Sequence, residues 1–257
     1  MKRTRVIPVL LLSQSGMVKT RAFAKPRYLG DPINAVKIFN EKMTDELILL
    51  DIEATAKGKV EFDWIEDIVS EAFMPIAYGG GLSTLDQCAQ LFSRGVEKVV
   101  INTAAIERPA LISEVSERFG AQSVVVSIDA RRNLWRQWKA YVKGARKETR
   151  FSPAELAQTC EKLGAGEIFL TSVEREGAFG GYDLELVRSV AEVVGVPVIA
   201  HGGAGSIADF APAVLEGGAS AVAAGSMFVF AAKDEGMLIS YPGQDELKAG
   251  FWSRLAA

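Results

Sequence analysis

The chain has 257 residues, of which 49% are hydrophobic and 24% are charged, and its formal net charge is −3. This composition supports a large core and gives no sign of a nucleic-acid or membrane partner. Apolar runs reach only about seven residues, far short of a membrane span, and we expect no signal peptide. Cys88 and Cys160 lack metal-like spacing, which predicts two lone buried thiols in a reducing cytoplasm.

Short apolar runs alternate with amphipathic stretches along almost the whole chain. The apolar runs predict strands at residues 6–11, 47–52, 75–78, 98–102, 123–128, 167–172, 197–200 and 221–224. Helical patterns lie between them, such as TLDQCAQLFSRG, which ends on a glycine of the C-cap type. The polar stretch that follows the first strand predicts a loop. Apolar strands separated by helices predict a parallel sheet.

Eight such units in about 250 residues indicate a (βα)8 TIM barrel, an α/β fold. A doubly wound open sheet usually shows a glycine-rich turn after its first strand, and this chain has none there. The segment LWRQWKAYV at 134–142 alternates as an exposed hairpin would after the fifth strand. Its Trp135, Trp138 and Tyr141 suit either a small satellite core or contact with an acceptor.

An internal repeat divides the chain into two similar halves. The segment at 75–106 aligns without a gap on the segment at 197–228, at a constant shift of 122 residues. Proline, Gly-Gly, the helix start, the helix-ending glycine and the next strand all coincide. A period near half the chain predicts one domain, residues 1–257, built from half-barrels at about 1–120 and 121–240.

The repeat also yields paired candidate sites at the ends of strands. Gly80-Gly81 and Gly202-Gly203 follow equivalent strands, and hydroxyl residues Thr103 and Ser226 follow the next strand of each half. Glycine lets backbone approach a ligand closely, and free N–H groups at a helix start favour an anion. The pairs predict two phosphate cradles at the barrel mouth, although tight strand-to-helix turns alone would also use Gly-Gly.

The runs LILLDI, YGGGLST, VEKVVINTAAI, AQSVVVSIDARR, GAGEIFLTSVEREG, GGYDLELVR and IAHGGAG occur in order over this duplication. With them the chain resembles HisF, the cyclase subunit of imidazole glycerol phosphate synthase, to about residue 230. The resemblance implies a lyase-type cyclase barrel that receives ammonia from a HisH glutaminase through its core. The ammonia would react with a bis-phosphate substrate at the mouth, in the pathway of histidine biosynthesis. No cofactor or metal is implied.

Residue by residue, the resemblance implies a catalytic role for Asp129, because HisF uses aspartates after strands one and five as acid and base. Leu11 stands where the other aspartate belongs, and a repeat shift of 118 independently places Leu11 opposite Asp129. A leucine cannot transfer a proton, and such a loss typically costs about 10²–10⁴ in rate. His201, the only histidine, and Glu53 are candidate substitute acids, although His201 also suits a hydrogen-bonded loop residue.

The resemblance further assigns residues to the two phosphates and the substrate. Within this set Glu176 replaces a family aspartate, and His201 beside the set replaces a small hydroxyl residue. The implied binding residues are Lys19, Gly80, Gly81, Asn102, Thr103, Glu176, Gly177, Gly202, Gly203, Gly225 and Ser226.

At the opposite end, HisF has a ring of charged residues that gates ammonia. Its counterparts are Arg5, Glu46, Lys98 and Glu167. Opposite charges around a small pore would satisfy one another, and Lys98 is predicted to pair with Glu46 or Glu167. Ordinary solvated charge where strands begin is the plainer interpretation. Glu97 matches a family residue that contacts the glutaminase.

Taken together, the residues keep an ammonia port and lack half of the acid–base pair. That combination is similar to HisF paralogues associated with surface-polysaccharide (lipopolysaccharide) biosynthesis, and this resemblance implies work with a HisH-like glutaminase and a sugar amidotransferase. They convert an acetamido group into an acetamidino group. Two other functions stay open: a cyclase with a substitute acid, and a non-catalytic scaffold that activates the glutaminase.

Overall fold

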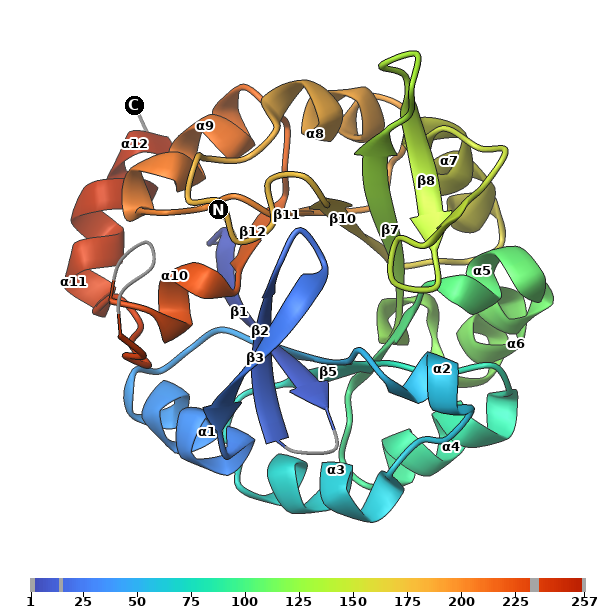
Figure 1. The fold of residues 1–257 in the computed structure, drawn as a ribbon, viewed down its shortest axis with the longest axis horizontal. Coiled ribbons are helices and arrows are strands. Elements are labelled where there is room, and N and C mark those ends of the chain that lie inside the picture. The colour runs from blue at the N-terminus through green and yellow to red at the C-terminus, as the bar shows by residue number, and fades with distance from the viewer. Residues whose placement is uncertain (1–2, 14–15, 232–235, 256–257) are drawn as a thin grey trace.

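A closed parallel barrel forms the centre of the molecule (Figure 1). The computed structural model describes residues 3–13, 16–231 and 236–255. The barrel strands are β1 (Arg5–Ser13), β4 (Leu47–Asp51), β5 (Ile76–Gly79), β6 (Lys98–Ile101), β7 (Val124–Arg132), β10 (Glu167–Ser172), β11 (Val198–His201) and β12 (Ala221–Ala224). They pair in chain order, and β12 pairs with β1 in parallel to close the ring. The predicted (βα)8 barrel is confirmed.

Helices surround the barrel on the outside (Figure 1). Local capping residues fix the starts of two of these helices. Thr84 forms a capping box with Gln87, and Ser152 forms one with Glu155. The helices are α1 (Pro32–Glu41), α2 (Ala54–Lys57), α3 (Phe62–Ser70), α4 (Leu85–Ser93), α5 (Thr103–Glu107), α6 (Ala110–Phe119), α7 (Pro153–Lys162), α8 (Leu184–Ala191), α9 (Phe210–Leu215), α10 (Ser226–Val229), α11 (Gln244–Leu247) and α12 (Ser253–Leu255), with short turns η1 (Ala121–Ser123), η2 (Ile207–Asp209) and η3 (Lys248–Trp252).

The barrel strands divide their side chains between two cores. Outward-facing residues pack under the helices in one large cluster. Inward-facing residues such as Ile7, Val9, Ile48 and Phe169 fill the barrel interior in a second cluster. Alternate residues of a strand point to opposite sides, so a continuous apolar run can serve both cores at once. Cys88 and Cys160 are free and buried, as predicted.

Two antiparallel hairpins extend the barrel beyond its mouth. After β1, the chain forms β2 (Gly16–Arg21) and β3 (Ala24–Gly30), and after β7 it forms β8 (Trp138–Val142) and β9 (Lys147–Glu148). The loop predicted after the first strand is therefore wrong from Gly16 onward, while the hairpin predicted around 134–142 is confirmed. β1 and β7 are equivalent strands of the two halves, so the hairpins rise from opposite sides of the mouth.

The C-terminal segment packs against the beginning of the chain. The Tyr241 hydroxyl donates to the Val6 carbonyl at 3.0 Å, and Trp252 Nε1 donates to the Thr4 carbonyl at 2.9 Å. The Arg3 guanidinium lies 4.3 Å from the centre of the Trp252 ring. This segment therefore lies beside the first strand of the barrel.

Candidate functional site at the two ends of the barrel

Four charged side chains form a closed ring at the N-terminal end of the barrel strands; we call them the charged ring. Arg5 pairs with Glu46 and lies 2.6 Å from a Glu167 oxygen. Lys98 Nζ lies 2.8 Å from Glu46 and 3.0 Å from Glu167. Each cation thus bridges both carboxylates, so the predicted pairing of Lys98 is confirmed with both partners.

The carboxylates of the charged ring are largely shielded from solvent, unlike ordinary surface charges at the starts of strands. The side chains of Glu46 and Glu167 are only 3% and 12% exposed. Burial alone would lower the pKa of Arg5, but the charges of Glu46 and Glu167 raise it above its ordinary value. Ionised groups at such depth are tolerated when they are paired, and each member here depends on two opposite charges.

An apolar interior separates the charged ring from the mouth. Ile7, Val9 and Leu11 of β1 lie in this cluster together with Val100 and Phe169. Several of the other inward residues are small, including Ala77, Ala221 and Ala223. A neutral molecule can cross such surroundings at less cost than an ion, because burying an unpaired charge is strongly unfavourable.

At the mouth, Asp129 is buried on β7 beside Asn102. Asn102 Nδ2 donates to the Ser127 carbonyl at 3.0 Å and to Asp129 Oδ2 at 3.3 Å. Burial raises the pKa of Asp129 to about 7, against the opposing effect of hydrogen bonds from Ser127 and Asn102. A carboxyl poised near neutral pH can both accept and donate a proton, which is the property that acid–base chemistry requires.

Leu11 occupies the equivalent place on β1. It pairs with Leu50 of β4 and with Val18 of the hairpin, while Asp129 pairs with Tyr141 of the other hairpin. Leu11 is 6% exposed and lies in the interior apolar cluster. The sequence patterns predict Leu11 as the last residue of its strand and Asp129 as the residue after its strand, but both lie within strands because β1 and β7 continue into hairpins. The predicted equivalence of Leu11 and Asp129 nevertheless holds in the structure.

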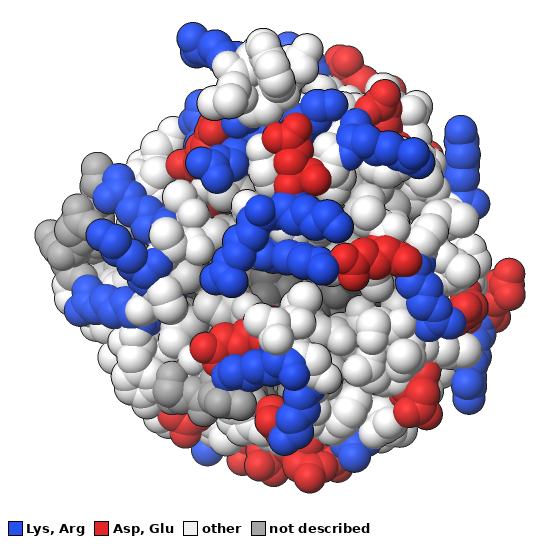
Figure 2. Space-filling view, turned by 45° about the vertical axis from the view of Figure 1, so that its right-hand side comes forward, with Lys and Arg blue, Asp and Glu red and all other residues white. Residues whose placement is uncertain are grey.

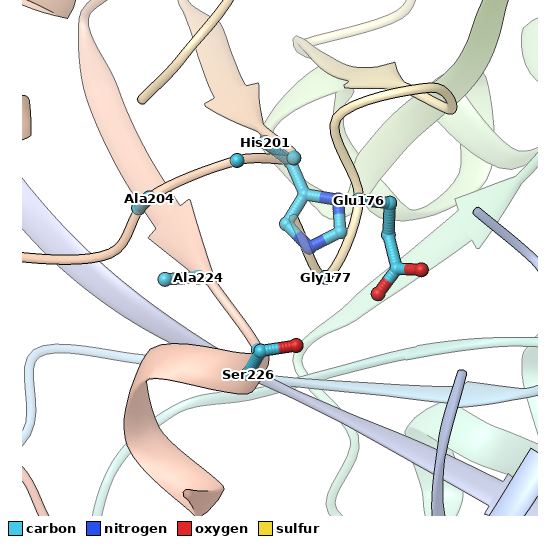
Figure 3. Close-up of a pocket in the computed structure, with 9 residues that line it drawn as sticks. Glu176, Gly177, His201, Ala204, Ala224 and Ser226 are labelled. Carbon is cyan, nitrogen blue, oxygen red and sulfur yellow. The ribbon is translucent and has the colours of Figure 1, made fainter. Parts of the chain in front are cut away.

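A small pocket opens among the second-half candidates, as Figure 3 shows. The side chains of Glu176, His201 and Ser226 extend into the same space around Gly177. The pocket lining comes from three consecutive strand-to-helix connections: Glu176, Gly177, His201, Gly202, Gly203, Ala204, Ala224, Gly225 and Ser226. Gly203 has φ +113°, and a Cβ there would lie 2.2 Å from the Gly181 carbonyl, so only glycine fits.

Lys19 reaches this pocket from the β2–β3 hairpin. Its ammonium pairs with the Glu176 carboxylate, and both side chains are almost fully buried. A Cβ on Gly225 would lie 3.2 Å from Lys19 Nζ. The Thr20 hydroxyl also donates to Glu176 at 3.1 Å. Lys19 and Glu176 therefore form a buried ion pair beside the pocket, with Glu176 in the pocket lining.

His201 is the least suited of the candidate acids in this geometry. Its ring stacks on Phe169 at 4.9 Å, and its Nδ1 lies 3.1 Å from the Thr171 hydroxyl. Burial, with a smaller effect from the charge of Lys19, lowers the pKa of His201 to about 3. The imidazole is thus neutral at pH 7 and carries no ready proton. The other candidate, Glu53, pairs with Lys57 on α2 at 2.6 Å.

The first-half candidates lie on the neighbouring connections after β5 and β6. Gly80 has φ +136°, and a Cβ there would lie 2.6 Å from the Asp51 carbonyl. The Thr103 hydroxyl accepts from the Lys143 N–H at 3.2 Å, and it also lies 3.4 Å from Asn102 Oδ1. The second half thus collects its residues into one pocket, while in the first half Asn102 and Thr103 are tied to β7 and to the turn between β8 and β9.

Sequence reasoning missed the residues that support these side chains. Thr20 and Thr171 hold Glu176 and His201, and Lys143 holds Thr103. Each acts through a contact between distant parts of the chain, so no local pattern marks it. Within the residues described, no group of three or more His, Cys, Asp or Glu could hold a metal ion, and no helix is long and apolar enough to cross a membrane.

Comparisons with known proteins agree with this arrangement. The family described as "Histidine biosynthesis protein" matches residues 5–234. The chain is 50% identical over 251 residues to "Putative imidazole glycerol phosphate synthase subunit hisF2" of Pseudomonas aeruginosa, covering 97% of this chain and 100% of that protein. It is 41% identical over 254 residues to "Putative imidazole glycerol phosphate synthase subunit HisF" of Leptospira interrogans, covering 98% and 100%. It is 42% identical over 231 residues to "Imidazole glycerol phosphate synthase subunit HisF" of Hyphomonas neptunium, covering 90% and 91%.

The fold and the two ends define a (βα)8 barrel with a small pocket at the C-terminal end of its strands and a charged ring at the other. The extent of the family match and these identities over whole chains make its membership clear. The chain belongs to the HisF family.

Proposed function

We propose that this chain is the ammonia-receiving subunit of a glutamine-dependent sugar-amidating assembly in the cytoplasm. A HisH-like glutaminase docks at the charged ring, and ammonia crosses the barrel to a sugar whose acetamido group becomes acetamidino, with the ammonia nitrogen replacing the amide oxygen, which leaves as water. A separate sugar amidotransferase supplies that acceptor, in surface-polysaccharide biosynthesis. The observation that carries the proposal is an intact charged ring at one end combined with Leu11 in place of a proton-transfer group at the other.

The N-terminal end of the barrel offers features that suit a protein partner. Glu97 is exposed next to Lys98 of the charged ring. Met43 and Phe73, in the segments leading into β4 and β5, are 68% and 87% exposed. Large exposed apolar side chains beside charged groups are typical of interfaces. These features support a glutaminase at this end, which delivers ammonia directly to the charged ring.

The mouth keeps features that suit a phosphorylated ligand. Lys19, paired with Glu176, lies beside the second-half pocket, and the backbone of Gly202, Gly203 and Gly225 in the pocket lining carries no side chain that would keep a phosphate away. Asp129 retains a pKa near 7, which suits it to accept a proton from ammonium. A cyclase that uses a substitute acid is less well supported, because His201 is neutral and Glu53 is paired with Lys57.

The test of lost cyclase chemistry is turnover of the bis-phosphate substrate of imidazole glycerol phosphate synthase with excess ammonium. We expect negligible turnover for the wild type, and a gain of about 10²-fold or more for Leu11→Asp, because the variant restores the second proton-transfer group. The double variant Leu11→Asp/Asp129→Asn is the matched control and should be inactive. Wild-type turnover equal to that of an authentic HisF would contradict the proposal.

The positive test is reconstitution with the glutaminase and the sugar amidotransferase. We expect the barrel to form a complex with the glutaminase, to raise its rate of glutamine hydrolysis, and to be required for amidated sugar at low ammonium. Activation without any dependence of amidation on the barrel would favour the scaffold function instead. The absence of both a complex and activation would refute the partner itself.

A further inference from the structure

The excursion between β7 and α7 carries most of its charge with one sign. Residues 131–150 contain eight Lys or Arg and a single acidic residue, Glu148, a local charge of +7 in a chain whose net charge is −3. Arg132 pairs with Glu185 and Lys143 pairs with Glu107. In the described part of the chain, Arg131, Arg136 and Arg146 have no carboxylate within 4.0 Å. Like charges held together without partners raise the local positive potential.

The turn of this hairpin presents two large apolar side chains to solvent. Leu134 is 96% exposed and Trp135 is 78% exposed. The turn is held by Asn133, whose Oδ1 accepts from the N–H groups of Trp135 and Gln137 at 3.0 Å each. A tryptophan on an ordered turn loses little conformational freedom when it inserts into a pocket, and Trp with Arg dominates binding hot spots.

The opposite hairpin adds charge of the same sign. Residues 16–30 contain Lys19, Arg21, Lys25 and Arg27 and no acidic residue. Of these only Lys19 is buried. The two hairpins rise from β1 and β7, on opposite sides of the mouth. Figure 2 shows long Lys and Arg side chains gathered near the centre of the view, with Asp and Glu side chains among them.

We propose that the two hairpins form a docking surface for an acidic protein, in which Trp135 inserts into an apolar pocket and the unpaired arginines face carboxylates. Resting on the proposed function, we identify this protein as the sugar amidotransferase. Ammonia that leaves the mouth would then enter its active site directly, without release to solvent. The glutaminase occupies the other end of the barrel, so the two partners do not compete.

The position of the turn favours a protein over a small ligand. Figure 1 shows the turn between β7 and β8 lying beyond the outline of the helix ring, far from the mouth. A molecule bound inside the barrel would not reach Trp135. A lipid surface is the other occupant to which basic and aromatic residues are suited, but one Leu-Trp pair supplies little apolar area for it.

The test compares two hairpin variants with a charge-matched control. Arg131→Glu/Arg136→Glu and Trp135→Ser are expected to weaken binding to the purified amidotransferase by about tenfold or more, the first most strongly at low salt. Arg118→Glu/Lys248→Glu makes the same charge change on α6 and η3 and should bind as the wild type does. Unchanged activation of the glutaminase shows that each variant is folded.

The outcomes separate this proposal from the proposed function. Loss of binding and of glutamine-dependent amidation in the hairpin variants supports both. If the hairpin variants amidate the sugar as fast as the wild type does, the docking surface is overturned and the proposed function stays intact. A wild type that binds through the hairpins without amidation overturns the function alone. No binding to the amidotransferase, with hairpin-dependent binding to vesicles of phosphatidylserine and phosphatidylcholine, overturns the protein partner in favour of a membrane.

Discussion

At the residue scale, Leu11 and Asp129 show how one position diverges between two similar halves. Both lie at the mouth end of a barrel strand, and both are buried. Leu11 packs into the apolar interior of the barrel. Asp129 places a carboxyl group at the equivalent position, and burial disfavours the charged form of that group. A leucine in place of an acid at one of two equivalent sites removes a proton-transfer group, and the position is still filled by a buried side chain.

The raised pKa of Asp129 predicts a specific pH dependence of stability. Its folded pKa, about 7, lies above the ordinary value of 3.8, so the folded protein binds the extra proton between these limits. Stability from this group therefore falls as pH rises from about 4 to about 7. Asp129→Asn lacks that loss, so its unfolding free energy relative to the wild type should rise over the same window and level off above it.

Urea unfolding of both proteins at pH 5 and pH 8 measures this difference. The comparison cancels other titrating groups, including His201, whose lowered pKa acts in the opposite direction. A constant difference between the two proteins across this range would show that Asp129 is ionised throughout.

At the element scale, the β2–β3 hairpin depends on one buried carboxylate. Glu176 pairs with Lys19, accepts from the Thr20 hydroxyl, and its carbonyl accepts from the Ala22 N–H at 2.9 Å. These contacts join the hairpin to the connection after β10, on the far side of the mouth. They explain why a polar segment that reads as a loop is ordered as two strands.

Glu176→Gln should release this hairpin. The variant leaves the Lys19 ammonium buried without its charge partner, which costs about 3–5 kcal/mol if the ion stays in place. Opening of the hairpin is the cheaper response, so trypsin should cleave faster at Arg21 and Arg27. Cleavage is measured by mass spectrometry under native conditions. Glu174→Gln, a neighbouring exposed residue, is the control and should cleave like the wild type; equal rates for both variants would contradict the role of Glu176.

At the scale of the whole molecule, the charged ring and the mouth with its pocket lie at opposite ends of one apolar interior. Removing one cation of the ring unbalances it, because Glu46 and Glu167 would then share Arg5 alone. Lys98→Ala should therefore loosen this end and let ammonia escape before it crosses the barrel. Glutamine hydrolysis should persist while amidated product falls.

The measurement is the ratio of amidated product to glutamate in the reconstituted assembly. Lys59→Ala removes an exposed lysine from the connection between α2 and α3, and this variant serves as the control. A ratio unchanged by Lys98→Ala would mean that ammonia takes another route and that the charged ring has only a structural role.

Features that depend on local sequence patterns could be predicted from the sequence, and features that depend on contacts between distant residues could not. The eight barrel strands were predictable because buried parallel strands are continuous apolar runs, and their pairing follows from the repeat. The pairing of Lys98 was predictable from the resemblance to HisF, which implies a ring of opposite charges at the starts of the strands. The hairpin strands after β1 were not, because Lys19 and Glu176 lie 157 residues apart and no local pattern connects them. The exposure of Trp135 likewise depends on how far its hairpin projects.

The contacts between the C-terminal segment and β1 have a consequence for the order of folding. β1 pairs with β4 on one side and with β2 near its mouth end, but β12, which pairs with residues 5–8, and the residues that bond the Val6 and Thr4 carbonyls come from the last part of the chain. These hydrogen bonds span 235 and 248 residues. During synthesis the edge of β1 at residues 5–8 must therefore stay open until nearly all of the chain has emerged, which makes closure of the barrel a late step and exposes that edge to wrong pairing before it.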